Sequence, residues 1–241
     1  MFTIKLLTGP GTLIDKLAIL IGFISITMFS IISHEISHGY AALLNGDTTA
    51  KENGRLKFNP SHHFEPLGTI MFFLVGFGWA KPIPVNSSNF NHYKKGMITV
   101  SLAGIVTNCL IAGLLLCVYF FALPLFYKFA SNIVLDFLKN FFYTFIVIGV
   151  RINFMLALFN LLPIYPLDGY NFIATLLPRC IGYQKFMIKW GQIIIFVIVA
   201  LGIVGRYTNI PWLDLFGSYD DLIIKLLNKV EIASIKFYWG S

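Results

Sequence analysis

The stretch "LAILIGFISITMFSIISHEISHGYAAL", from Leu17 to Leu43, places two histidines and a glutamate near the end of a long apolar run. Its first sixteen residues carry no charge, and the whole stretch is long enough to cross a bilayer as a helix. Ionisable side chains inside a membrane span are costly and usually have a function. The fold and the function therefore depend on what His34, Glu35 and His38 do there.

The composition places the rest of the chain in a membrane as well. Hydrophobic residues make up 57% of the 241 residues, charged residues make up 12%, and the mean hydropathy is +0.76. Soluble domains are closer to half apolar and a quarter charged. The net charge of +7 comes from dispersed basic residues, which favours loops facing anionic lipid and predicts no nucleic-acid partner. We expect the first apolar run to be retained, because cleavage as a signal peptide would remove the histidines.

Four segments are long and apolar enough to be transmembrane helices, at about 14–44, 97–123, 140–164 and 188–205. The fold class that follows is an all-α polytopic membrane protein. We predict a single membrane-embedded domain over 1–241, with a core at about 17–175 and a C-terminal span and tail at 188–241.

Two further segments have weaker patterns. Residues 66–80 are too short to span and contain three glycines, so we predict a re-entrant or β-hairpin segment shielded by other helices. Its continuation to residue 86 could offer an edge to an extended substrate by strand addition. The tail from Tyr219 to Lys236 has Leu222, Leu226 and Val230 on one helical face, which predicts an interfacial helix.

The distribution of lysine and arginine predicts the orientation. If 66–80 does not cross, the loops at 45–96 and 165–188 share one side and carry eight basic residues. The loop at 124–139 on the other side carries only Lys128 and Lys139. The positive-inside rule then places the first side in the cytoplasm.

The spacing of the first motif indicates a metal site. His34 and His38 are four residues apart, which puts both imidazoles on one face of a helix, where they can bind one Zn²⁺. Glu35 is adjacent but rotated, so it can act as a base without ligating the metal. A catalytic zinc takes three protein ligands. Asp168, directly after the third span, emerges on the side of His34 if 66–80 does not cross.

Other interpretations stay open at this point. Asp168 could instead cap the helix that follows it, and Glu65 could supply the third ligand of a membrane zincin that cuts soluble loops. A metal-ion transporter or an inactive scaffold is a third alternative, although no repeated halves are visible in the hydropathy.

The segments "HEISHG" (34–39) and "NLLPIYPLDG" (160–169) together resemble the site-2 protease family of intramembrane zinc metalloproteases. The segments "GWAKPIPVN" (78–86) and "SLAGIVTN" (101–108) are similar to its compact bacterial branch, which lacks a PDZ domain. The resemblance implies Zn²⁺ on His34, His38 and Asp168, with Glu35 as the base. It also implies that Asn160 contacts the substrate or the developing oxyanion, and that transmembrane proteins are the substrates. The expected location is the bacterial inner membrane, with the active site toward the cytoplasm and any regulatory partner unknown.

Five other polar residues have simpler interpretations. Asn108 and Asn153, within spans, are expected to join helices. Arg151 is expected to pair with a nearby polar group, and His62 and His63 are expected to be a solvated loop pair.

Overall fold

The computed structural model describes residues 11–63, 65–68, 80–128, 132–208 and 215–239. Over these residues it contains helices and no strand. Most of the predicted re-entrant segment at 66–80 lies outside the described residues, apart from a helical turn at 66–68 and Ala80. The hairpin and its strand edge therefore stay predictions.

Four helices are long and apolar enough to cross a membrane, as the sequence predicts. They belong to α2 (Leu13–Leu44), α6 (Tyr93–Lys128), α7 (Ile133–Asn160) and α9 (Ile181–Thr208). Large apolar side chains such as Leu110, Leu114 and Phe196 remain exposed on their outer faces, which suits a lipid environment.

The boundaries of the third span differ from the prediction at both ends. It was expected at about 140–164, but α7 begins at Ile133, where the side chain of Asn132 accepts hydrogen bonds from the backbone N–H groups of Val134 and Leu135. The helix ends at Asn160, ahead of two prolines that cannot continue it. Hydropathy alone misses the start because the first turns of α7 include Asp136 and other polar residues.

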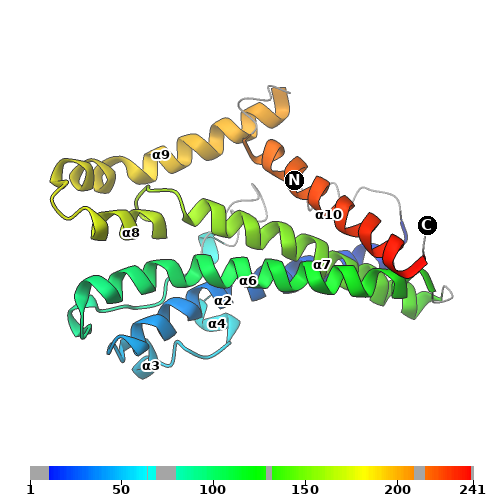
Figure 1. Ribbon diagram of the computed structural model, residues 1–241, viewed down its shortest axis with the longest axis horizontal. Coiled ribbons are helices and arrows are strands. Elements are labelled where there is room, and N and C mark those ends of the chain that lie inside the picture. Colours follow the sequence, from blue (N-terminus) through cyan, green and yellow to red (C-terminus); the bar gives the residue numbers. More distant parts are fainter. Residues whose placement is uncertain (1–10, 64, 69–79, 129–131, 209–214, 240–241) are drawn as a thin grey trace.

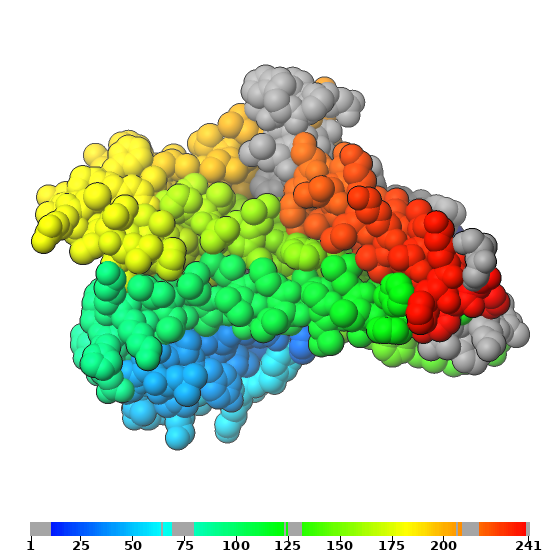
Figure 2. Space-filling view, viewed as in Figure 1, coloured from blue at the N-terminus to red at the C-terminus, as the bar shows by residue number. Residues whose placement is uncertain are grey.

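The core is formed by α2, α6 and α7, which pack against one another along the length of the molecule (Figure 1). Its buried apolar side chains come from all three helices and from α10 (Leu215–Trp239): Phe23, Ile26, Leu115, Tyr119, Ile146, Ile148, Val150, Ile223 and Leu227. In Figure 2 the amino-terminal part, coloured blue and cyan, lies below the green α6, and the orange to red α10 lies above it.

The tail forms a helix, as predicted, and one face of it packs against the core. Ile223 and Leu227 are buried against the core, whereas Leu222 is 64% exposed. The buried face also includes Ser234, whose hydroxyl donates to the Phe120 carbonyl at 2.6 Å. The sequence pattern does not reveal this contact with the core, because a polar residue lies on the buried face. Placement of α10 at the membrane interface stays a prediction.

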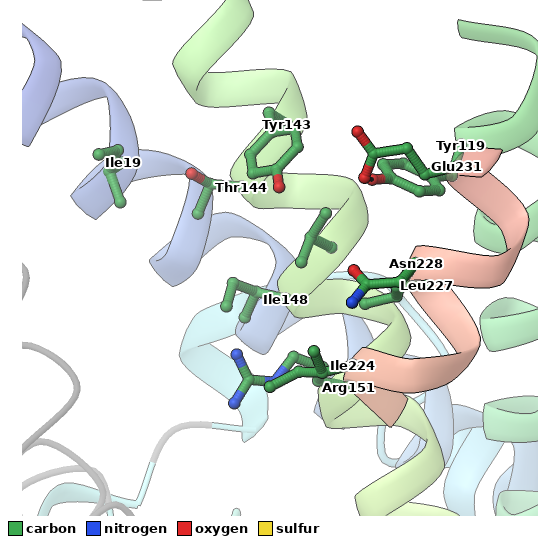
Figure 3. A pocket seen from close by; sticks show the side chains of 11 residues that line it. Ile19, Tyr119, Tyr143, Thr144, Ile148, Arg151, Ile224, Leu227, Asn228 and Glu231 are labelled. Carbon is green, nitrogen blue, oxygen red and sulfur yellow. Dashed lines mark hydrogen bonds between the residues drawn. The ribbon is translucent and has the colours of Figure 1, made fainter. Parts of the chain in front are cut away.

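A cavity of about 330 Å³ lies between α10 and the core helices (Figure 3). Its polar lining includes Tyr119, Tyr143, Arg151 and Glu231. The Tyr119 hydroxyl is 3.2 Å from a Glu231 carboxylate oxygen, and the Arg151 guanidinium pairs with Asp220 at 2.7 Å. The sequence prediction that Arg151 has a nearby polar partner is thus confirmed.

Short elements fill the connection between α2 and α6. These are α3 (Thr49–Glu52), α4 (Pro60–His63) and the 3₁₀ turn η1 (Ser87–Asn89), followed after α7 by α8 (Asp168–Leu176). Asp47 is fully buried and joins two parts of the connection, because its carboxylate accepts from the backbone N–H of Asn86 at 2.7 Å and from the side chain of Asn89 at 2.9 Å.

Candidate metal centre

His34 and His38 project from one face of α2, as their spacing requires. Both side chains are buried, and their Nε2 atoms lie 3.1 Å apart. Their rings are nearly perpendicular, with centroids 4.7 Å apart. The two nitrogens therefore face a common point.

Asp168 brings a carboxylate to the same point from the first turn of α8. Its Oδ2 lies 3.4 Å from the Nε2 atom of each histidine. The alternative that Asp168 caps this helix does not fit, because Leu167 occupies the N-cap position and no side-chain capping bond is made. Oδ2 is buried and receives no hydrogen bond from the described residues.

The other ring nitrogen of each histidine contacts an oxygen on α6. His34 Nδ1 lies 2.6 Å from the Asn108 side-chain oxygen, and His38 Nδ1 lies 2.8 Å from the Val100 carbonyl. Both oxygens accept hydrogen bonds, so the Nδ1 atoms carry the protons and the Nε2 lone pairs are directed inward. Such outer contacts hold ligating imidazoles in position in metalloproteins.

Asn108 is itself held by a buried network that joins the three core helices. Its amide donates to the Asn153 side-chain oxygen at 2.7 Å, and the Asn153 amide donates to the Ser30 hydroxyl at 2.7 Å. All three side chains are fully buried. The two asparagines do join helices, as predicted, but Asn108 also orients His34, which the sequence analysis missed. An asparagine in an apolar helix can be recognised in the sequence as a candidate for such a role. The backbone carbonyl of Val100 cannot, because every residue has one.

A glycine on α6 makes room for the imidazole. A Cβ atom at Gly104 would overlap the ring of His34, with Nδ1 only 2.6 Å away. The absence of a side chain here lets α6 approach α2 closely enough for the Asn108 contact.

The remaining candidates make other contacts. The Glu35 carboxylate accepts from the backbone N–H of Ile83 at 2.9 Å. The Asn160 amide donates to the Leu156 carbonyl one turn earlier at 3.0 Å, so its substrate role stays a prediction. Glu65 accepts from the backbone N–H of Gly68. His63 is buried, not solvated as predicted, because α4 packs against α2.

The three inward atoms form a set that suits a cation. His34, His38 and Asp168 each offer one ligand atom, all within 4.8 Å of one another, and this group could hold a metal ion. Two imidazole lone pairs and a carboxylate oxygen repel one another when buried together, and a bound Zn²⁺ would convert that repulsion into ligation. The cavity beneath α10 contains none of these residues and is a separate feature.

One comparison with known proteins identifies a relative. The chain is 35% identical over 229 residues to a protein of Bacillus subtilis (strain 168) named "Putative zinc metalloprotease YwhC". The match covers 94% of this chain and 97% of that protein. No family model matches the chain, and no solved structure does.

Proposed function

Because this chain belongs to the zinc metalloprotease family of that relative, we propose that it is an intramembrane protease of the site-2 type. Its reaction would be hydrolysis of peptide bonds in membrane-spanning substrates. The observation that carries the proposal is the convergence of His34, His38 and Asp168 at helices long and apolar enough to cross a bilayer. The buried Asp168 oxygen, which receives no hydrogen bond from the described residues, supports metal ligation.

In this proposal His34, His38 and Asp168 hold the metal, and Glu35 is the catalytic base. Zn²⁺, when bound, supplies a Lewis acid that polarises the scissile carbonyl and lowers the pKa of water. Glu35, one residue from His34, accepts the proton of the attacking water and then delivers it to the leaving amine. Asn160 would release its bond to Leu156 to donate to the oxyanion.

The substrate class follows from the depth of the site. A peptide bond inside a helix has its carbonyl engaged, so a transmembrane substrate must unwind locally before its carbonyl can be attacked. We propose that the site faces the cytoplasmic side of a bacterial inner membrane, because the connections at 45–96 and 165–188 carry eight basic residues and the connection at 124–139 carries two.

The test uses the purified full-length protein in liposomes with a single-span reporter whose membrane segment contains glycine and proline. The wild type is expected to cleave it and to retain zinc, measured by elemental analysis. Glu35→Gln is expected to retain zinc and lose cleavage. Glu52→Gln, an exposed glutamate on α3, is the matched control and is expected to behave as the wild type.

Two results would refute the proposal. One is full cleavage by Glu35→Gln. The other is cleavage of a soluble peptide with the same sequence while the membrane reporter stays intact, which would favour a protease acting on soluble loops.

A further inference from the structure

The Glu35 side chain is held by a chain segment that is itself fixed at several points. Ile83 donates its backbone N–H to Glu35 Oε2 at 2.9 Å. On the N-terminal side, Lys81 donates its N–H to the His63 carbonyl at 3.0 Å. On the C-terminal side, Asn86 donates its N–H to the buried Asp47. Residues 81–86 therefore have a fixed position relative to α2.

Arg55 supplies a further attachment from the connection after α3. Its Nη2 atom lies 3.0 Å from the Lys81 carbonyl oxygen and 3.2 Å from the Pro82 carbonyl oxygen. The Pro82 oxygen and the Ile83 N–H belong to the same peptide unit. One peptide group thus links the Arg55 guanidinium at its oxygen to the Glu35 carboxylate at its N–H.

This arrangement strengthens the bond to Glu35. A cation on the carbonyl oxygen polarises the peptide group, which makes its N–H a better donor to an anion. Pro82 and Pro84 have no N–H, so Ile83 provides the donor of this tripeptide. Removal of the guanidinium would weaken both the polarisation and the fixed orientation of the peptide plane.

The packing of Ile83 keeps the peptide close to α2. Its side chain is buried, and it approaches the helix at Gly39, one turn after Glu35. A Cβ atom at Gly39 would lie 2.6 Å from the Ile83 side chain and 2.5 Å from that of Leu56, the neighbour of Arg55. The missing side chain at Gly39 thus admits both residues to the same face.

We propose that Arg55 is a positioning residue for Glu35 and acts through the Pro82–Ile83 peptide. The proposal rests on the proposed function, in which Glu35 is the base. Arg55 touches neither the metal ligands nor the substrate in this role. Its contribution is to hold the carboxylate in one orientation, so its loss should lower kcat and leave KM nearly unchanged.

The first experiment measures kcat and KM on the liposome reporter for Arg55→Gln, Arg55→Lys and Arg179→Gln, an exposed arginine as control. We expect Arg55→Gln to lower kcat by about 10- to 100-fold, the range for a misplaced catalytic group. Arg55→Lys keeps the charge and should restore part of the rate. Zinc content and thermal stability should match the wild type in all three variants.

The second experiment is a double-mutant cycle with Ile83→Pro, which removes the N–H, measured against Ile83→Ala, which keeps it. If Arg55 acts through this peptide, Arg55→Gln should lower kcat much less in the Ile83→Pro background than in the wild type. Multiplicative losses would overturn the proposal, as would a rise in KM alone. A loss of zinc or stability in Arg55→Gln that accounts for the lost rate would also overturn it. Failure of the proposed function itself would appear differently, as full activity in Glu35→Gln.

Discussion

Two groups of polar side chains among the helices differ in which partners neutralise their charges. Beside α10, the Arg151 guanidinium contacts both oxygens of Asp220, and Tyr119 donates to Glu231. Around His34 and His38, the outer nitrogens are paired, but the inner lone pairs and a buried Asp168 oxygen face one another. In the first group Asp220 neutralises Arg151, whereas in the second no Lys or Arg side chain among the described residues pairs with Asp168.

This difference separates a structural role from a metal-binding role. A buried charge is tolerated when a partner of opposite sign neutralises it, as with Arg151 and Asp220. Converging acceptors without a donor are tolerated when a cation completes them. Variants of the two histidines' surroundings and of the Arg151–Asp220 pair test this separation.

The largest effect is expected for Asp168→Asn, which removes the charge but keeps the shape. We expect loss of bound zinc and of reporter cleavage. Excess zinc should stabilise the wild type by about 2.7 kcal/mol at one hundred times its Kd, and this stabilisation should disappear in the variant. Asp220→Asn is the reference and should keep its zinc. Zinc retention by Asp168→Asn at the wild-type level would contradict the assignment.

The next effect compares two glycines on α6. Gly104→Ala should displace the His34 ring and weaken zinc binding and cleavage, because the new methyl group would overlap that ring. Gly113→Ala meets no atom within 4 Å and should keep its zinc, while the gain in helix propensity raises stability by up to about 1 kcal/mol. Competitive zinc titration and thermal unfolding distinguish the two. Equal zinc affinities of Gly104→Ala and Gly113→Ala would show that the packing of α6 at Gly104 does not affect the position of the His34 ring.

A smaller effect is expected from the outer contact of His34. Asn108→Ala should reduce zinc affinity by about 10- to 100-fold, the usual cost of losing such a partner. The comparison is Asn228→Ala, an exposed residue that lines the cavity below α10. Its zinc affinity should equal that of the wild type, as measured with a chromophoric chelator. An unchanged affinity in Asn108→Ala would mean that the Asn108 contact does not orient the imidazole.

The parts of the site that the sequence predicts are those set by helical periodicity and by motif. The spacing of His34 and His38 fixes them on one face of α2, and the topology of the spans brings Asp168 to the same side. The four spans follow from apolar length. These features depend on local pattern, which a single sequence contains.

The parts that it does not predict depend on backbone groups or on packing between distant segments. Every residue has a backbone carbonyl, and every residue except proline has a backbone N–H. The sequence therefore does not show that the Val100 carbonyl and the Ile83 N–H contact the site. The packing of the tail helix on the core is not visible in its sequence, because the packed face includes Ser234, whose hydroxyl donates to the Phe120 carbonyl 114 residues away. His63 is polar and lies in a connection, which predicts exposure, but the packing of α4 against α2 buries it.

Disruption of the Arg151–Asp220 pair is expected to lower stability without changing zinc binding. Arg151→Ala leaves Asp220 without its partner, which costs 3–5 kcal/mol at fully buried sites. Both side chains are 23% exposed, so we expect about 2–3 kcal/mol here. Arg151→Met with Asp220→Leu should recover part of this loss, and zinc content should be normal throughout. A large zinc loss would show that the two groups are coupled.

The smallest effect concerns Asp47, a buried carboxylate outside the spans that is satisfied by neutral donors. Burial alone would raise its pKa, but hydrogen bonds from Thr49, Asn86 and Asn89 outweigh burial and lower the pKa below the ordinary 3.8. A lowered folded-state pKa contributes stability above the ordinary value, and this contribution disappears as the pH falls through the folded-state pKa.

The corresponding variant is Asp47→Asn. It should lose about 1–2 kcal/mol near neutral pH, because the amide replaces one acceptor oxygen with a donor. The difference in unfolding temperature from the wild type should shrink as the pH falls below the ordinary pKa of 3.8 and through the lowered pKa of the wild-type carboxylate. A difference in unfolding temperature that stays constant with pH would show that the charge of Asp47 does not contribute to stability. Residue 47 would then hold Asn86 in place through hydrogen bonding alone.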